Sequence, residues 1–359
     1  MGFGETAFVT GFPGFIAGRL VRRLAKEGGR FLLLVQPALA RRAREELEQL
    51  ARSEGRSLGD FRILEGDISR NDLGLTERDL EMARAESTLI FHLAAAYDLA
   101  VPRKLAMSVN VTGTRYVNEL ARSFPNLRHY HYVSTCYVAG KRRGRILENE
   151  LEHDAGFRNH YEETKYLAEI EVDSLKASLP VTIHRPSVVC GDSRTGETAK
   201  FDGIYYLIRY LLKWPHFLSF FNIGNREVSL NLVPVDFVVE ALAALAQDTR
   251  AIGKTLQLAD PAPLSTFELF NAIARELTGS GSRITCPAPL VQFSLMLPLS
   301  PPLTGLPHSA VPYFFLNQTY DSDESSELLA SHGISCPQFP SYVHSIVDYA
   351  AHNRLPSPS

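Results

Sequence analysis

The first residues whose types and spacing could do chemistry are Tyr161 and Lys165, in the segment HYEETKYLAE (160–169). A spacing of four places both side chains on one face of a helix. Tyrosine is a poor acid at neutral pH because its usual pKa is about 10, and an adjacent ammonium lowers that pKa by favouring the phenolate. Such a proton donor suits reduction of a carbonyl beside a nicotinamide, in which hydride goes to carbon and a proton to oxygen. The same spacing occurs by chance in many helices, so other residues have to support this interpretation.

Two hydroxyl side chains, Ser134 and Thr135, end the apolar segment LRHYHYVST (127–135), which we predict to be a strand. In a doubly wound sheet, ligands bind outside the carboxyl ends of the strands. A hydroxyl at this position can therefore hold the carbonyl oxygen of a substrate next to Tyr161.

Strands and helices alternate over the first half of the chain, and these elements must position the candidate residues. The predicted strands are 6–10, 31–35, 61–67, 87–95, 127–135 and 181–186, and the predicted helices include 15–26, 41–55, 104–123 and 161–178. Strands that are buried on both faces and separated by helices indicate a parallel sheet with helices on each side. Right-handed crossovers then give an α/β fold with a doubly wound, Rossmann-type sheet.

Beyond about residue 195 proline and aromatic residues become more frequent, and helices dominate. The predicted helices there are 236–247, 266–278, 322–331 and 340–352. Residues 1–195 are therefore predicted to form the Rossmann domain, and residues 196–359 mainly a smaller, mostly helical substrate cap. The segment VSLNLVPVDF (228–237) is predicted to return to the main sheet, with part of 228–260 belonging to the first domain, so the boundary is discontinuous.

The segment FVTGFPGFIAGRLVRRL (8–24) places glycines between the first predicted strand and the first predicted helix. In the dinucleotide-binding fingerprint, one glycine permits a tight turn, a second lets a pyrophosphate approach the backbone, and a third small residue lets helix and strand pack closely. Gly11, Gly14 and Ala17 match these positions. The start of the helix also offers free N–H groups and a positive dipole end to phosphates. The alternative is a plain strand–turn–helix connection.

The end of the second predicted strand indicates which dinucleotide binds. NAD sites usually carry Asp or Glu there, to hold the ribose 2′-OH. This strand ends Val35-Gln36-Pro37 without an acid, and Arg41 and Arg42 follow shortly. A guanidinium near that ribose favours a 2′-phosphate, so we predict NADP. The alternative is that both arginines only solvate a surface helix, since Arg44 continues the run.

The composition excludes several classes of protein. The 359 residues are 45% hydrophobic, and a net charge of −3 gives no strong field for nucleic acid. The four cysteines are widely spread without a C-x-x-C pair, which disfavours zinc and disulfides and fits a reducing cytoplasm. No signal peptide is predicted at the N-terminus, and prolines interrupt the longest apolar stretch, 289–306. We therefore predict a cytoplasmic protein without a metal, a nucleic-acid partner or a transmembrane segment.

These parts occur in the order typical of the extended short-chain dehydrogenase/reductase family, which the sequence resembles over most of its length. The matching motifs are TGFPGFIA (10–17), GDI (66–68), HLAA (92–95), VNVTGT (109–114), VSTCYVAG (133–140), YEETK (161–165) and HRPSVVCGDSRTG (184–196). The resemblance implies that Thr135, Tyr161 and Lys165 are the catalytic set, with Thr135 where many members carry Ser. It also implies that Lys165 reaches the nicotinamide ribose. By analogy, a homodimer would form through the helices 104–123 and 161–178.

The residue patterns and the resemblance together predict the cofactor contacts. They are Thr10, Gly11, Phe12, Gly14, Phe15, Ile16, Gln36, Arg41, Arg42, Asp67, Ile68, Leu93, Ala94, Ala95, Asn110, Val133, Tyr161, Lys165, Pro186 and Val188. The resemblance implies that 92–95 line the nicotinamide side and that 186–188 lie against the cofactor. Asp67 would accept from the adenine amino group, although an N-cap near Ser69 explains it equally well.

Several segments resemble one branch of the family, the thioester reductases and fatty acyl-CoA reductases of the male-sterility type. They are VSTCYVAG (133–140), RPSVVCGDSRTGE (185–197), LNLVPVDFVVEAL (230–242) and ADPAPLSTFELFNAIA (259–274). This resemblance implies NADPH-dependent reduction of an acyl thioester, bound to CoA or a carrier protein, to an aldehyde and in some cases on to an alcohol. Hydride would attack the carbonyl directly while Thr135 and Tyr161 stabilise the developing oxyanion, so no acyl-cysteine is needed.

The remaining candidates concern the substrate. Tyr97, Cys136 and Tyr137 are candidate substrate contacts, although Cys136 has no evident base and is better interpreted as a packing residue. The segments 204–221 and 291–299 are apolar and aromatic enough to wall an acyl groove. Alternatively, they form only the core of the cap, or dock on a membrane surface.

Two other functions stay open at this point. A dehydrogenase or epimerase of a nucleotide sugar or sterol-like alcohol shares these motifs, and basic residues scattered through 199–300 are compatible with a bound diphosphate. The apolar character of 204–221 argues mildly against a sugar. A non-catalytic NADP-binding sensor or scaffold is the other class, but such relatives usually lose the tyrosine or the lysine that this chain retains.

Overall fold

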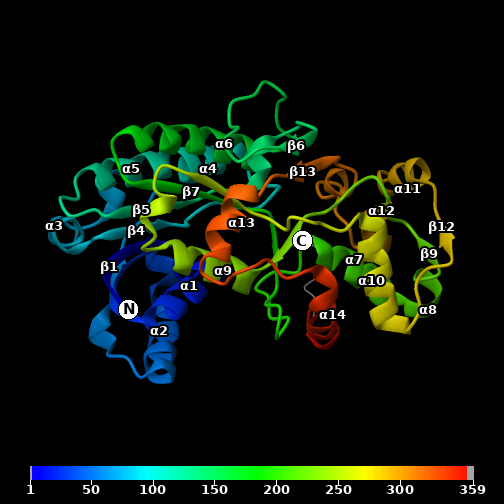
Figure 1. The fold of residues 1–359 in the computed structure, drawn as a ribbon, viewed down its shortest axis with the longest axis horizontal. Coiled ribbons are helices and arrows are strands. Elements are labelled where there is room, and N and C mark those ends of the chain that lie inside the picture. Colours follow the sequence, from blue (N-terminus) through cyan, green and yellow to red (C-terminus); the bar gives the residue numbers. More distant parts are fainter. Residues whose placement is uncertain (1, 354–359) are drawn as a thin grey trace.

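The computed structural model describes residues 2–353, and seven parallel strands in these residues form its main sheet (Figure 1). The strands lie in the order β11-β7-β5-β4-β1-β2-β3. Their bounds are β1 (Phe3–Thr10), β2 (Gly28–Val35), β3 (Phe61–Glu65), β4 (Leu89–His92), β5 (His129–Val133), β7 (Val181–Pro186) and β11 (Thr255–Leu258). This order confirms the predicted doubly wound sheet. The six predicted strands are all present, and β11 is one that we did not predict.

Both faces of the sheet are buried, because alternate side chains along each strand point to opposite faces. In β1, Ala7 and Val9 pack into one hydrophobic cluster and Phe8 into the other. The first cluster includes helices α1 (Phe15–Ala25), α2 (Ala40–Glu54) and α9 (Val235–Leu245), and the second includes α3 (Glu77–Glu86), α5 (Gly113–Arg122) and α6 (His160–Asp173). Helices therefore cover both faces of the sheet, and the loops lie at the two ends of its strands.

The predicted helix 104–123 contains one wide turn. A π-helical segment, Met107–Thr112, joins α4 (Arg103–Ala106) to α5. Such π-turns are frequent at functional sites. The segment contains the buried Asn110, whose partners lie in the candidate site.

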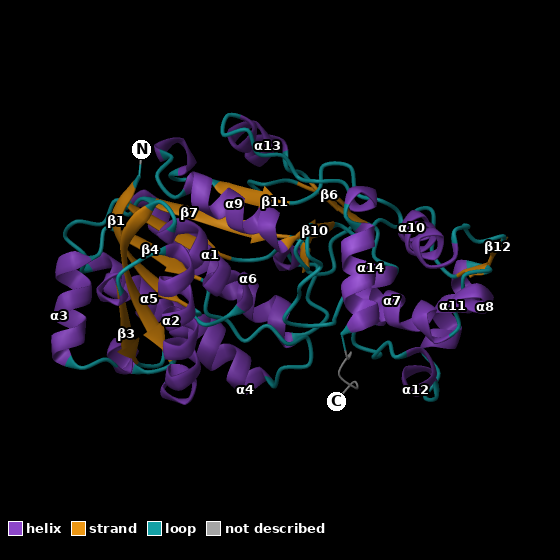
Figure 2. Ribbon diagram, turned by 90° about the horizontal axis from the view of Figure 1, so that it is seen from below, coloured by secondary structure: helices purple, strands orange, loops and turns teal. Residues whose placement is uncertain are grey.

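A mostly helical cap lies beyond one edge of the sheet, as Figure 2 shows. Its helices are α7 (Ile204–Lys213), α8 (Pro215–Leu218), α10 (Thr266–Thr278), α11 (Ala288–Leu295), α12 (Ser300–Thr304) and α14 (Val343–His352). Buried side chains such as Ile208, Phe270 and Ile346 join α7, α10 and α14 into a separate core. No helix described within residues 2–353 has the length and apolar content needed to cross a bilayer. Residues 354–359 of the predicted cap lie outside the described residues.

The segment 228–237 corrects one prediction, because it does not join the main sheet. Its strand β10 (Leu232–Pro234) pairs in parallel with β8 (Val188–Cys190) in a sheet of two strands. Asn231 sets this pairing: its amide accepts from the Ser187 hydroxyl at 2.7 Å and donates to the backbone of Asp260 at 2.8 Å. The main sheet is instead extended by β11, and α13 (Asp323–Ala330) packs against it.

Buried histidines lie between the central strands. His129 and His131 of β5 and His184 of β7 form one group, in which the His131 Nδ1 atom lies 3.0 Å from Nε2 of His184. Burial lowers the pKa of His184 and of His92 in β4 to about 3, and that of His129 to about 4. These rings are therefore neutral in the folded protein at neutral pH.

Because these histidines are buried in the neutral form, we predict that the free energy of unfolding falls in mild acid. Below an unfolded pKa of about 6.5 the unfolded chain binds protons that the folded chain does not, so the free energy of unfolding falls by about 1.4 kcal/mol per pH unit for each such histidine. Urea unfolding measured from pH 7.5 down to pH 5 checks this. We expect the slope to become shallower in His184→Gln and to stay unchanged in His216→Gln, at an exposed position. A stability that is flat down to pH 5 would contradict the prediction.

Candidate active site

Tyr161 and Thr135 meet at the carboxyl end of β5. Thr135 follows β5 by two residues, and Tyr161 lies in the first turn of α6. Burial raises the pKa of the Tyr161 phenol to about 12, and the nearby Thr135 hydroxyl opposes this rise with a smaller effect. Thr135 also accepts from the backbone N–H of Tyr137 at 3.2 Å, which fixes its orientation. Two hydroxyl groups are therefore held side by side, and both carry their protons at neutral pH.

Lys165 lies on the same helix but makes its contacts with β5. Its buried ammonium donates to the Tyr132 hydroxyl at 2.8 Å and to the Val133 carbonyl at 2.9 Å. Burial lowers the pKa of Lys165 to about 7, against the opposing effect of Glu169. We predicted that Lys165 lowers the pKa of Tyr161, and the structure differs: the ammonium is engaged by β5, and burial leaves the pKa of Tyr161 raised.

The two hydroxyls at the end of β5 have different roles. Ser134 donates to the carboxylate of Glu169, which also accepts from the guanidinium of Arg185 at 2.6 and 2.8 Å. Glu169 and Arg185 are fully buried. The Ser134 hydroxyl is thus used in a structural network, and Thr135 is left as the hydroxyl available to a substrate.

The glycine turn after β1 packs too closely against neighbouring backbone to accept side chains at Gly11 and Gly14. Gly11 has a φ of +92°, and a Cβ added there would lie 2.9 Å from the backbone N of Ala94. A Cβ on Gly14 would lie 2.5 Å from the Gly11 carbonyl oxygen. No side chain caps α1, and its first turn contains no acidic residue, so its N–H groups are open to an anion. This geometry fits the pyrophosphate of a dinucleotide.

A series of hydrogen bonds holds the turn after β4 in place at the carboxyl ends of the strands. The Thr10 hydroxyl lies 2.7 Å from Nδ1 of His92 and accepts from the Ala94 N–H at 3.1 Å, while Nε2 of His92 lies 3.0 Å from the Thr114 hydroxyl. The first turn after β4 is therefore fixed against β1 and α5. Leu93, Ala94 and Ala95 are partly exposed on this turn, as a cofactor contact requires.

Asn110 holds the same turn from the other side. Its amide oxygen accepts from the Ala96 N–H at 2.8 Å, and its amide nitrogen donates to the Ala96 carbonyl at 3.0 Å and to the Thr164 hydroxyl at 2.9 Å. Asn110 was predicted to contact the cofactor. The structure gives its amide protein partners instead, so it positions the turn after β4 against α6.

The other predicted cofactor contacts fall into two groups. Phe15, Ile16, Val133 and Val188 are partly exposed, and Gln36, Arg41 and Arg42 are exposed. Phe12, Ile68 and Pro186 are buried, and the first two belong to the hydrophobic clusters on the two faces of the sheet. The side chains of Phe12 and Ile68 therefore serve the core.

The structure distinguishes the two arginines that follow β2. Arg42 donates to the Pro13 carbonyl at 3.3 Å and so reaches the glycine turn. Arg41 points into solvent, with 85% of its side chain exposed, and pairs with Glu45 at 2.8 Å. Of the two arginines, Arg42 is therefore the one that lies near the glycine turn.

Asp67 hydrogen-bonds within its own turn, as the alternative of an N-cap near Ser69 predicted. No helix begins at that point, however. Its Oδ1 atom accepts from the backbone N–H of Ser69 at 2.9 Å and from its hydroxyl at 2.7 Å. Its Oδ2 atom lies 3.4 Å from the Gln36 amide. Both side chains remain on the surface beside the end of β2, so an adenine contact stays a prediction.

The predicted substrate residues have different surroundings. Tyr97 is exposed, with the Lys200 ammonium 4.0 Å above its ring. Tyr137 lies 4.7 Å from the ring of Tyr313. Cys136 is buried, its thiol donates to the Arg185 carbonyl, and burial raises its pKa, so it is a packing residue rather than a nucleophile.

Tyr313 is a residue that the sequence did not reveal. It comes from the cap turn Val311–Phe314, and its hydroxyl donates to the buried carboxylate of Glu162 at 2.5 Å and accepts from the Asn159 amide at 2.7 Å. Glu162 directly follows Tyr161. The cap is thereby fastened to the first turn of the helix that carries the candidate proton donor.

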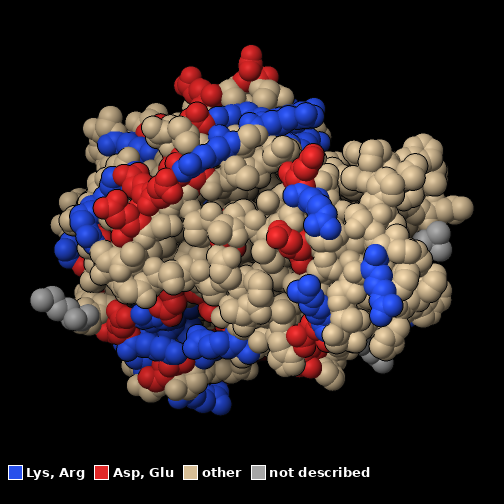
Figure 3. All heavy atoms as spheres, turned by 45° about the vertical axis from the view of Figure 1, so that its right-hand side comes forward, with Lys and Arg blue, Asp and Glu red and all other residues tan. Residues whose placement is uncertain are grey.

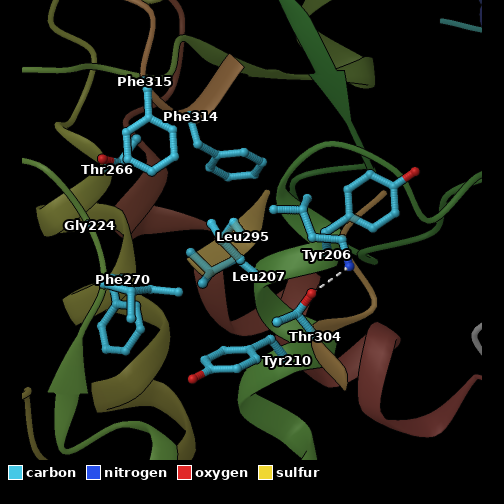
Figure 4. Close-up of a pocket in the computed structure, with 12 residues that line it drawn as sticks. Tyr206, Leu207, Tyr210, Gly224, Thr266, Phe270, Leu295, Thr304, Phe314 and Phe315 are labelled. Atoms are coloured by element: carbon cyan, nitrogen blue, oxygen red, sulfur yellow. Dashed lines mark hydrogen bonds between the residues drawn. The ribbon is translucent and has the colours of Figure 1, made fainter. Parts of the chain in front are cut away.

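The cap contains a small, partly open apolar pocket, drawn in Figure 4. It is lined by Tyr206, Leu207, Tyr210, Ile223, Gly224, Thr266, Phe270, Leu295, Thr304, Leu306, Phe314 and Phe315. The segments 204–221 and 291–299, predicted to wall a groove, both contribute to it. Phe314 and Phe315 directly follow Tyr313, so one short segment borders both the cavity and the first turn of α6.

The sequence can now be compared with known proteins. Residues 9–242 match the family model described as male sterility protein. The chain belongs to this family. The match begins at the end of β1 and covers the glycine turn, strands β2 to β7 and all three predicted catalytic residues, and it confirms the branch that the motifs indicated.

The similar curated proteins include several reductases. The chain is 26% identical over 277 residues to fatty acyl-CoA reductase wat of Drosophila melanogaster, covering 67% of this chain and 54% of that protein. It is 27% identical over 299 residues to a carboxylic acid reductase of Segniliparus rugosus, covering 74% of this chain and 24% of that protein. The chain thus spans about half of the first relative and about a quarter of the second.

Solved structures extend the similarity to the cap. The terminal R domain from the myxalamid PKS-NRPS biosynthetic pathway has a TM-score of 0.81 and 25% identity, covering 97% of this chain and 90% of that one. An archaeal thiolation-reductase di-domain, at 16% identity and a TM-score of 0.75, shares the fold. Family and neighbours confirm the predicted class, an NAD(P)-dependent enzyme of the extended short-chain dehydrogenase/reductase type.

The glycine turn gives a direct test of the cofactor site. Gly11→Ala places a Cβ against the backbone of Ala94, so we expect dinucleotide binding to weaken at least tenfold, as measured by calorimetry. Gly55→Ala is the matched control, because Gly55 also has positive φ (+64°) but nothing within 4 Å of the added carbon. It should cost about 1 kcal/mol of stability and leave binding intact. Unchanged binding by Gly11→Ala would show that the ligand does not use this turn.

Proposed function

We propose that the protein is an NADPH-dependent reductase that delivers hydride to the carbonyl carbon of an acyl thioester, bound to CoA or to a carrier protein, or of a related apolar aldehyde or ketone. The paired hydroxyls of Thr135 and Tyr161 at the carboxyl end of β5 are the observation that carries this proposal. The names of the relatives, which include fatty acyl-CoA and carboxylic acid reductases, support it.

The chain offers a separate region for each part of the cofactor. The turn at Gly11 and Gly14 and the N-terminus of α1 would hold the pyrophosphate, and Arg42 the 2′-phosphate. The turn at 92–95 would border the nicotinamide, and Lys165 would hold its ribose. When bound, NADPH supplies the hydride.

The protein's own groups then manage the oxygen and the proton. As the carbonyl carbon gains hydride, negative charge develops on its oxygen, and the Thr135 hydroxyl donates a hydrogen bond to it. Tyr161 transfers its proton to the same oxygen. A phenol with a pKa of about 12 keeps this proton at neutral pH and releases it only to a strongly basic oxygen, such as this developing alkoxide.

The thioester carbon becomes tetrahedral in this step, and no enzyme thiol is required. Collapse of the resulting hemithioacetal breaks the carbon–sulfur bond, releases the thiol of the carrier and leaves an aldehyde. Cys136 is buried and has a raised pKa, which is consistent with direct hydride attack. The apolar cavity of the cap is the place where we assign the acyl chain.

The first test is NADPH oxidation by Tyr161→Phe with medium-chain and long-chain acyl-CoA, the matching aldehydes and one UDP-sugar. We expect kcat to fall about 10²- to 10⁴-fold with unchanged NADPH affinity, because only the proton donor is lost. Tyr166→Phe, a partly buried tyrosine of the same helix, is the matched control and should keep its activity. Full activity of Tyr161→Phe would exclude it as the proton donor. Conversion of the UDP-sugar alone, followed by chromatography because epimerisation consumes no NADPH, would point to the epimerase class.

The preference for NADPH has its own test. Because Arg42 reaches the glycine turn and Arg41 does not, Arg42→Ala should weaken NADPH binding about 10- to 100-fold and leave NADH binding unchanged. Arg41→Ala is the matched control and should change neither affinity by more than about twofold. If the two substitutions weakened NADPH binding equally, or if Arg42→Ala weakened NADPH and NADH binding equally, Arg42 would be ruled out as the 2′-phosphate ligand.

A further inference from the structure

Large apolar side chains are exposed together at the far end of the cap. This surface, called the cap tip below, consists of Trp214, Phe217, Phe220, Ile284, Leu290, Phe293, Met296, Leu297 and Leu299. Leu299, Phe293 and Trp214 are 72%, 69% and 68% exposed. The other large apolar residues exposed in the described part of the chain, such as Leu58 and Leu105, lie elsewhere and singly along the sequence. A concentration of this kind marks an interaction site.

The cap tip is one continuous surface built from two distant segments. Strand β9 (Phe221–Asn222) pairs with β12 (Ile284–Thr285), and the Arg283 N–H donates to the Phe220 carbonyl at 3.0 Å. The Phe221 ring packs against Phe217 and Phe220 at 5.7 and 5.2 Å. In Figure 1, α8, β12 and α11 lie together at the end of the molecule away from the main sheet.

The two segments that form the cap tip carry basic but no acidic side chains. Residues 203–226 and 277–320 contain no Asp or Glu, but they contain Arg209, Lys213, Arg226 and Arg283. The chain as a whole has 40 acidic and 37 basic residues, so this segregation is not a property of the composition. Figure 3 shows it: the right-hand end of the molecule is uncharged apart from basic side chains, while acidic side chains gather over the rest.

Folding of the cap does not explain these side chains. Helix α11 buries Val291 and Leu295 on its inner side, and Leu295 lines the apolar cavity. Leu290 and Phe293 of the same helix face outward and are 65% and 69% exposed. A helix that is apolar on both sides is normally covered on both sides.

We propose that the cap tip binds the surface of an anionic lipid bilayer. Trp214, Phe293 and Leu299 would enter the boundary between headgroups and acyl chains, where tryptophan and other apolar side chains are favoured. Arg283, exposed beside Ile284, would meet lipid phosphates. A second copy of this chain fits less well, because two cap tips would bring basic charge against basic charge. Since binding involves no chemical step, the proposal is independent of the proposed reaction.

The protein carries its own probe for this test. Trp214 is its single tryptophan and lies in the cap tip. Vesicles of phosphatidylcholine with 30% phosphatidylglycerol should shift its emission to the blue, and brominated lipids should quench it. Vesicles of phosphatidylcholine alone should bind more weakly, because they offer no net negative charge to the exposed Arg283.

Variants distinguish binding through the cap tip from nonspecific hydrophobic binding to lipid. Phe293→Ser combined with Leu299→Ser should weaken binding to the anionic vesicles at least tenfold, measured by flotation and by Trp214 emission. Leu58→Ser is the matched control, because Leu58 is 54% exposed but lies before β3 in the Rossmann domain. It should bind as the wild type does. All three positions are exposed, so folding should be preserved, and circular dichroism checks it.

Three results would overturn the proposal. The first is the absence of flotation and of a blue shift with anionic vesicles. The second is an equal loss of binding in Leu58→Ser and in the double variant. The third is a blue shift without lipid that grows with protein concentration and accompanies a dimer in sedimentation, since the cap tip would then join two copies. NADPH oxidation with a soluble short-chain thioester reports separately on the proposed reaction.

Discussion

The parallel register of the main sheet is the constraint on which the candidate site depends. Thr10 of β1, His92 of β4 and Tyr132 of β5 are level across three neighbouring strands, so the chain leaves all three at one edge. The glycine turn, the turn at 93–96 and Thr135 are brought together for that reason. Hydrogen bonds from β1 through His92 to α5 then fix the edge. A slip of one residue in any of these strands would turn its side chains to the other face and dismantle the site.

Burial decides the protonation states at this edge. Tyr161 keeps its proton because a phenolate there would lose solvation, and Lys165 holds its own proton only weakly for the same reason. The ion pair of Glu169 and Arg185 is equally buried, but each partner compensates the other. The site therefore combines the mutually neutralised pair of Glu169 and Arg185 with two groups, Tyr161 and Lys165, whose protonation depends on what binds.

The sequence predicted what local patterns decide: six strands, the main helices and the glycine turn. Apart from the meeting of Thr135 and Tyr161, it did not predict contacts between distant segments. The apolar strand in 228–237 shows no sign of its partner, which Asn231 selects by bridging two other loops. Tyr313 lies 151 positions from Glu162, and no spacing rule connects them. The spacing of four placed Lys165 on the correct face of α6, but the direction of its ammonium depends on oxygen atoms of β5.

The cap shows why an apolar composition is ambiguous and how the structure resolves it. The segment 291–299 is equally compatible with a substrate groove, a core and a membrane surface. Leu295 and Phe293 are two residues apart, yet one lines the cavity and the other is exposed to water. Exposed apolar area costs about 25 cal/mol per Å² relative to burial, and polar residues at the outer positions would avoid that cost without disturbing the core. Folding alone therefore accounts for the inner side chains but not for the outer ones, and a partner that covers the cap tip supplies the missing reason.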